Sequence, residues 1–181
     1  MRPFKGTISI DEARGLLVAH VRPIARTERV PLARAGGRIA SADLTAQVFV
    51  PPFSRSAMDG YAVIAADTTG AAPSTPVTLP ITERVFTGNT PIHGIGRGEC
   101  SEIATGAPLP EGSDAVVMGE ETRRVDEDHV EILAAATAGQ NIGRRGADMT
   151  AGGVVVSAGD VLTPGRVGAI AATGALTVDV F

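Results

Sequence analysis

The chain has 181 residues, enough for one ordinary domain or two small ones, and 44% of them are hydrophobic. The formal net charge is −4 and no basic stripe with interleaved aromatics occurs, so nothing in the composition favours binding to nucleic acid. A single cysteine, Cys100, excludes an internal disulfide and is typical of a reducing, cytoplasmic setting. No stretch approaches the roughly 20 apolar residues of a membrane span, which argues against a membrane partner.

The amino-terminal part of the chain predicts helices. Ser9-Ile10-Asp11-Glu12 has the pattern of a capping box, in which the Ser9 hydroxyl accepts from the amide of Glu12. The helix should continue to about His20 or Val21, with one face formed by Ala13, Leu16, Leu17 and His20. A second short helix is expected from Leu32 to about Ala40, although Gly36-Gly37 disfavours it.

The middle of the chain predicts β-structure, with short apolar or alternating segments separated by turn residues. Asp126-Glu127-Asp128 is typical of a solvated hairpin turn. The expected strands are Gln47–Val50, Tyr61–Ile64, Val77–Leu79, Thr82–Phe86, Ala115–Met118 and His129–Leu133.

Near the end, Ala158-Gly159-Asp160 between two valine-rich segments indicates another hairpin. Thr163-Pro164 has the pattern of a helix N-cap and first helical residue, and Gly174 of the stop. Leu176–Phe181 predicts a strand, and its apolar end suggests a chain cut from something longer. The fold class is therefore α+β: a discontinuous α/β domain from both termini (1–45 plus 139–181) carrying an inserted, β-rich domain (46–138).

Three segments are too unusual for simple connections. In the first, 51–61, Pro51-Pro52 stiffens the approach to Asp59-Gly60, which precedes the only tyrosine. A carboxylate on a stiff loop is a suitable ligand for Mg²⁺ or a proton acceptor, and the alternative is that Asp59 only shapes the turn. In the second, 104–114, Thr105-Gly106 offers a hydroxyl and an approachable backbone to phosphate oxygens, and the alternative is an ordinary loop.

The third segment, 140–148, places Arg144 and Arg145 between glycines and ends on another carboxylate, Asp148. Adjacent guanidinium groups bind phosphate by charge-assisted hydrogen bonds, and the alternative is a solvated surface pair. Other features give weaker indications of a functional site. The three histidines have no metal-ligand spacing, and Cys100 is expected to be a small buried residue.

These three segments occur in the same order in a known family. Ser56-Ala57-Met58-Asp59-Gly60-Tyr61-Ala62, followed by Thr105-Gly106-Ala107-Pro108-Leu109-Pro110-Glu111-Gly112 and by Gln140-Asn141-Ile142 with Arg144-Arg145-Gly146, resembles the amino-terminal region of MoeA-type molybdopterin molybdenumtransferases, which is also found in the E domain of gephyrin. The resemblance covers essentially the whole chain.

The resemblance implies a function in molybdenum cofactor biosynthesis. Members are homodimers that insert molybdate into adenylated molybdopterin with a divalent cation such as Mg²⁺ and release AMP. Their pterin substrate, adenylated molybdopterin, is supplied by an adenylating partner enzyme. Their cleft lies between the β-domain of one subunit and a later domain of the other. The positions that match the family's motifs imply three catalytic residues: Asp59, Thr105 and Asp148. Asp59 is also the expected ligand for Mg²⁺. The expected substrate-binding residues are Ser56, Met58, Gly60, Gly106, Asn141, Arg144 and Arg145.

The chain also departs from the family's pattern. Gly143 stands in place of an arginine, Ala147 of a glutamate, Ser54 of an acidic residue and Glu102 of an arginine. Glu102 would add unfavourable charge if it faced an anionic ligand. Because the family continues past Phe181 into further domains, the isolated chain is expected to be inactive. The alternatives are a non-catalytic dimerisation or scaffold module of the same fold and an unrelated metal-dependent phosphohydrolase.

Overall fold

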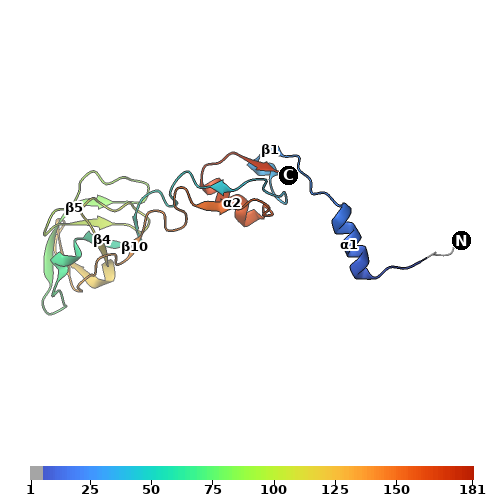
Figure 1. The fold of residues 1–181 in the computed structure, drawn as a ribbon. Coiled ribbons are helices and arrows are strands. Elements are labelled where there is room, and N and C mark those ends of the chain that lie inside the picture. The colour runs from blue at the N-terminus through green and yellow to red at the C-terminus, as the bar shows by residue number, and fades with distance from the viewer. Residues whose placement is uncertain (1–5) are drawn as a thin grey trace.

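The computed structural model describes residues 6–181, so the first five residues of the expected terminal domain lie outside it. The fold is mixed α+β with few helices and short strands, which confirms the predicted class (Figure 1). No helix in the described part of the chain is long and apolar enough to cross a membrane. The helices are α1 (Ile10–His20) and α2 (Pro164–Ala172), with short 3-10 turns η1 (Leu32–Arg34), η2 (Ala65–Thr68) and η3 (Gly119–Glu121).

The strands gather in one larger sheet and three two-stranded pairs. The larger sheet has the order β7-β4-β6-β5-β9-β8, formed by β4 (Gly60–Val63), β5 (Val77–Val85), β6 (Cys100–Ile103), β7 (Ala115–Met118), β8 (Thr122–Arg124) and β9 (His129–Ile132). The pairs are β1–β12 (Glu28–Pro31, Thr177–Val180), β2–β11 (Leu44–Thr45, Val154–Val156) and β3–β10 (Arg55–Ser56, Ile142–Gly143).

The six-stranded sheet curls around its own core. One face of it buries aliphatic side chains together with Tyr61 and Cys100, as expected from a chain with few aromatics. The other face packs Ala62, Val85 and Ile103 against the loop that carries Ala107. The hairpin turn expected at 126–128 joins β8 to β9 as predicted.

A separate core unites the two ends of the chain. Val30 on β1 and Val178 on β12 lie opposite each other in the antiparallel pair, and Ile170 of α2 is buried in the same cluster. The predicted caps of α2 are present, since the Thr163 hydroxyl accepts from the amide of Arg166 and Gly174 adopts a φ of +83°. Figure 1 shows this core at the middle of the molecule, with the curled sheet at one end.

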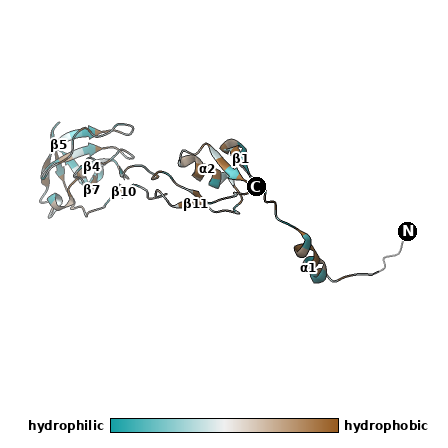
Figure 2. Cartoon of the chain, turned by 45° about the horizontal axis from the view of Figure 1, so that its top comes forward, coloured by the Kyte–Doolittle hydropathy of each residue, from teal (hydrophilic) through white to brown (hydrophobic). Residues whose placement is uncertain are grey.

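Helix α1 begins as predicted, because the Ser9 hydroxyl accepts from the amide of Glu12 at 3.1 Å. It lies apart from the rest of the molecule at the end opposite the curled sheet (Figure 1) and buries none of its residues. Its apolar and polar residues are both visible in Figure 2. The face expected around Leu16 and Leu17 is therefore exposed, at 51% and 64% of those side chains.

The predicted second helix is wrong. Only the turn η1 forms, and the chain then bends at Gly37, whose φ of +78° is unfavourable for a residue with a side chain. Ile39 and Ala40 instead bridge to Val161 and Val180. These long-range backbone hydrogen bonds replace the helical ones that two glycines had weakened.

Three strand predictions also change. Gln47–Val50 is not a strand, apart from one bridge between Val50 and Met149. Val77–Leu79 and, apart from Phe86, Thr82–Phe86 fall in a single strand, β5, which exchanges its partner from β9 to β6 directly after Pro80. The hairpin expected around Gly159 does not form, because β11 pairs with β2.

Candidate active site

The three unusual segments lie side by side around strand β3. The backbone of Ser56 joins the second segment, since its amide donates to the carbonyl of Ala107 at 3.0 Å and its carbonyl accepts from the amide of Gly106 at 2.8 Å. The third segment pairs with the first through β10, and the amide of Ala57 donates to the carbonyl of Asn141 at 2.9 Å. Local sequence motifs more than 40 residues apart thus form one continuous surface.

Asp59 is fixed by the second segment. Its Oδ1 atom accepts from the backbone amide of Thr105 at 2.6 Å, and its carbonyl accepts from the amide of Gly119 at 3.0 Å. The hydrogen bonds from Thr105 hold the pKa of the Asp59 carboxyl below its ordinary value, so the group is charged at neutral pH. Asp59 and Thr105 are both exposed, so the carboxylate remains accessible to a ligand.

The residues around Asp59 mainly shape its loop. The buried Ser56 hydroxyl accepts from the amide of Met58 at 3.2 Å, whereas Met58 itself is 43% exposed. Asn141 adopts a φ of 55° and its side-chain amide donates to the carbonyl of Val116 at 2.9 Å. Gly60 has no room for a side chain, because a Cβ atom there would lie 1.9 Å from the carbonyl oxygen of Val117.

The backbone of the second segment is less available than the sequence suggested. The amide of Thr105 is donated to Asp59 and that of Gly106 to Ser56, so neither is free to contact a phosphate oxygen. The expectation of an approachable backbone at 105–106 is therefore wrong for these two amides. The reason is tertiary, because both acceptors come from the first segment.

Asp59 lines a cavity of about 460 Å³ at one end of the curled sheet. Strands β4, β5, β6 and β8 and the turn η3 all contribute to its wall. The remaining lining residues are Gly60, Tyr61, Val85, Phe86, Glu102, Ile103, Ala104, Gly119, Thr122 and Arg124. Such a volume falls within the range of about 300–1,000 Å³ that is typical of small-molecule sites.

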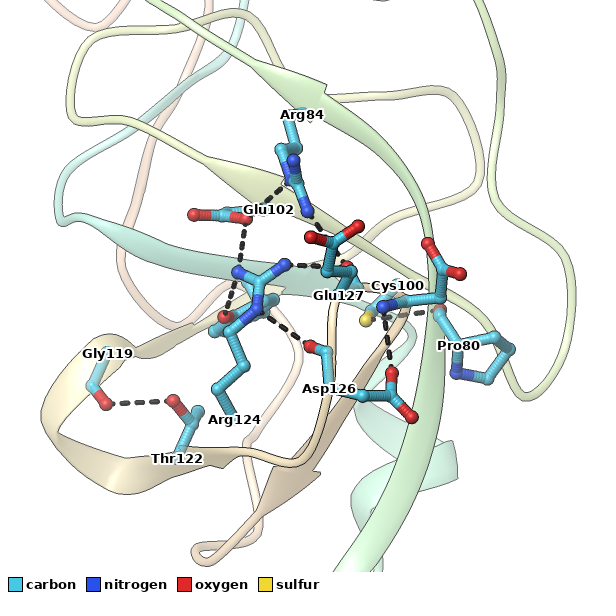
Figure 3. A network of polar contacts seen from close by, with 11 residues as sticks. Pro80, Arg84, Cys100, Glu102, Gly119, Thr122, Arg124, Asp126 and Glu127 are labelled. Atoms are coloured by element: carbon cyan, nitrogen blue, oxygen red, sulfur yellow. Dashed lines mark hydrogen bonds and ion pairs between the residues drawn. The ribbon is translucent and has the colours of Figure 1, made fainter.

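Glu102 faces this cavity but does not stand alone. Its Oε2 atom lies 3.2 Å from Nε of Arg84 and 2.7 Å from a terminal nitrogen of Arg124, as Figure 3 shows. Arg84 and Tyr61 are the direct cross-strand neighbours of Glu102 on β5 and β4. The unfavourable charge expected at Glu102 is thus offset by two guanidinium groups, which sequence reasoning missed because it requires the register of three strands.

The ionisation of Tyr61 tests this network. Burial raises the pKa of the Tyr61 hydroxyl, the charge of Glu102 raises it further and Arg124 lowers it. We expect Glu102→Gln to lower the pKa of Tyr61 and Arg124→Gln to raise it. Since the chain has one tyrosine and no tryptophan, ultraviolet titration of phenolate absorbance reads this group alone. Unchanged pKa values in both folded variants, with folding verified by circular dichroism, would contradict the network.

The third segment contributes its backbone to the site, while its charged side chains lie elsewhere. The guanidinium of Arg145 stacks over the ring of Phe49, 4.1 Å from the ring centre. Both Arg144 and Arg145 are exposed, and neither lines the Asp59 cavity. Asp148 lines a different cavity of about 330 Å³, next to Met149 and Ala169. The structure therefore brings together Asp59 and Thr105 but not Asp148 or the two arginines.

Other departures from the family's pattern have local explanations. Ser54 accepts from the amide of Arg145 at 3.1 Å through its hydroxyl. Beside Gly143 the side chain of Arg55 fills the space, since a Cβ atom at Gly143 would lie 3.3 Å from Cγ of Arg55. Nothing in the structure explains Ala147. Cys100 is fully buried as expected, and burial raises the pKa of its thiol to about 12.

Comparison with known proteins identifies the family. The family described as the MoeA N-terminal region (domain I and II) matches residues 8–174. The chain belongs to this family. A solved MoeA protein of molybdopterin biosynthesis from Pyrococcus horikoshii OT3 superposes with a TM-score of 0.88 and 36% identity, over 94% of this chain and 45% of that one.

Curated relatives of this MoeA N-terminal region carry enzyme names. Molybdopterin molybdenumtransferase 2 of Mycobacterium tuberculosis is 40% identical over 87% of this chain and 39% of its own length. Molybdopterin molybdenumtransferase of Bacillus subtilis is 35% identical over 96% of this chain and 41% of its own. The chain thus spans less than half the length of these relatives.

Proposed function

We propose that this MoeA N-terminal region is part of an enzyme that inserts molybdate into adenylated molybdopterin and releases AMP. The observation that carries the proposal is the Asp59 carboxylate, which lines a cavity and is held by the backbone amide of Thr105 at 2.6 Å. The relatives, which match across most of this chain, are named as transferases of molybdenum to molybdopterin, and the adenylated substrate and the release of AMP follow from the family resemblance.

In this proposal Asp59, Thr105 and Asp148 are catalytic residues, and each has a different role. Asp59 is a fixed negative charge that accepts a proton or binds a cation next to the phosphoanhydride that is cleaved. The Thr105 hydroxyl binds an oxygen of the substrate. Asp148, which faces a separate cavity, would reach the same substrate only in an assembly that places a second wall over both cavities. Arg144 and Arg145 would contact the substrate's phosphates from the same assembly.

The residues present fit a magnesium ion only if the substrate and water supply most of its ligands. Among the described residues, no cluster of three or more His, Cys, Asp or Glu side chains forms a ready-made site. Asp59 is exposed and uses one carboxylate oxygen for Thr105, so its other oxygen is left for a cation. Mg²⁺ commonly binds through one or two carboxylates together with substrate phosphates and water. When bound, the ion would neutralise charge at the phosphoryl oxygens.

We also propose the domain division at 1–45 plus 139–181 and 46–138, supported by the core of the chain ends, which is separate from the cores of the curled sheet. Residues 139–143 depart from this division, because β10 pairs with β3 and Ile142 packs against the curled sheet. The working protein is proposed to be a cytoplasmic homodimer that receives its pterin from an adenylating partner. Several large apolar side chains outside the cores are exposed, which favours an assembly that covers them.

Turnover assays on two proteins test the proposal. The longer protein that contains this chain should form molybdenum-loaded cofactor from adenylated molybdopterin and molybdate, with release of AMP. Residues 1–181 alone should not, because the Asp59 cavity is open on one side. Insertion by the 181-residue chain would contradict the need for a second wall, and inactivity of the longer protein towards this substrate would contradict the function.

A further inference from the structure

The Asp59 cavity continues into a second one. That neighbour has a volume of about 620 Å³ and shares Phe86, Glu102 and Arg124 with the first. Together they form a groove across the open end of the curled sheet.

The charges in this groove disfavour a bare phosphate. The two cavities are lined by four carboxylates, of Asp59, Glu102, Asp126 and Glu127, against the guanidinium groups of Arg84 and Arg124, which leaves two net negative charges. The guanidinium of Arg124 is also occupied. It donates to Glu102 at 2.7 Å, to the Tyr61 hydroxyl at 3.5 Å and to the carbonyls of Asp126 and Glu127 at 2.9 and 2.7 Å (Figure 3). Little of its donor capacity remains for a phosphate oxygen.

The same groove has features that favour a flat, hydrogen-bond-donating ligand. Phe86 directly follows β5, and the residue is 58% exposed although large apolar side chains are normally covered. Arg124 presents a planar guanidinium that its four partners hold in place, and such planes stack on aromatic rings. Glu102 offers carboxylate oxygens, which accept hydrogen bonds from N–H groups.

We propose that this groove binds the heterocyclic ring of the substrate, a neutral purine or pterin that lies against Phe86 and donates N–H groups to Glu102, while Asp59 stays on the side of the phosphates. The inference rests on the proposed function for the choice between these two rings. It makes Phe86 a specificity-determining residue and places the phosphates of the substrate outside the groove, beyond Asp59.

The single tyrosine permits a direct test. In the 181-residue chain labelled with ¹³C on tyrosine, one ring signal reports on Tyr61, which lines the groove. The chain is titrated without Mg²⁺ with adenosine, with neopterin and with inorganic phosphate. We expect a saturable shift of the Tyr61 signal with one of the two rings, which identifies the ring bound, and none with phosphate.

Matched variants locate the contact. Phe86→Ala should weaken ring binding by roughly fivefold or more, because stacking on an aromatic side chain is lost. Phe53→Ala should bind normally, since Phe53 is similarly exposed, at 42%, but does not line either cavity. Both side chains are exposed enough to be removed without unfolding the chain, which a proton–nitrogen correlation spectrum verifies.

Two outcomes would overturn the inference: no shift of the Tyr61 signal with either ring up to its solubility limit, whether or not phosphate causes one, or equal ring binding by the Phe86→Ala variant and the wild-type chain. These outcomes are independent of turnover. If the longer protein is active but the 181-residue chain binds neither ring, the proposed function stands and the ring site in the groove is contradicted. If the chain binds a ring but the longer protein is inactive, the ring site stands and the proposed function is contradicted.

Discussion

Asp59→Asn is expected to lower molybdate insertion by the longer protein on the order of 100-fold or more. A positioned carboxylate that accepts a proton contributes roughly 10²- to 10⁴-fold to a rate. Asparagine keeps the shape of the side chain, and its carbonyl oxygen still accepts from the amide of Thr105, a bond of 2.6 Å in the native loop. The substitution therefore removes the charge while it preserves the loop, and release of AMP measured at saturating substrate reads the effect.

The control for Asp59→Asn is Glu111→Gln, which removes a charge from another exposed carboxylate that does not line the Asp59 cavity. It should leave turnover within about twofold of wild type, in line with the small effects of most surface substitutions. Full activity of the Asp59 variant would contradict the catalytic role proposed for Asp59, whereas no turnover by either the wild-type or the control protein would favour the alternative of a dimerisation or scaffold module. Dimerisation, measured by light scattering, should be the same in both variants.

Gly60→Ala is expected to unfold the curled sheet. A Cβ atom at this position would lie 1.9 Å from the carbonyl oxygen and 2.9 Å from the carbonyl carbon of Val117, on the neighbouring strand β7. Backbone atoms in the middle of a sheet cannot move aside as the end of a flexible side chain can. The free energy of unfolding should therefore fall by more than about 4 kcal/mol, a size reserved for severe steric or packing defects. Urea denaturation of the 181-residue chain measures this.

Gly119→Ala is the matched control for the glycine substitution. Gly119 lies in the same region, yet a Cβ atom there would be 3.8 Å from the carbonyl oxygen of Asp59, an ordinary contact. Its stability should change by no more than about 1 kcal/mol. Similar stability of the Gly60 variant and wild type would show that β4 and β7 lie farther apart than described. Gly60 would then be available for the substrate-binding role that the family resemblance implies.

Local signals in the sequence determined the ends of the elements. Ser9 and Thr163-Pro164 start the two helices, Gly174 ends the second, and the acidic turn at 126–128 joins β8 to β9. Each of these depends on hydrogen bonds or backbone angles within four residues, so the amino-acid order alone specifies it. The motif around Asp59 likewise resembles one family by its residues alone, and a family match over residues 8–174 agrees with it.

Tertiary structure decided what those local signals become at the site. Asp59 receives its hydrogen bond from Thr105, 46 residues away, and Glu102 is neutralised by Arg84 and Arg124 on two other strands. The order of the strands and their register set these contacts, and a shift of one residue would turn each side chain to the opposite face. The same long-range pairing turned the expected helix at 32–40 into bridges to Val161 and Val180. The sequence by itself thus determined the caps, the turns and the family, whereas the charge balance of the cavity and the constraint on Gly60 exist only once distant strands pair.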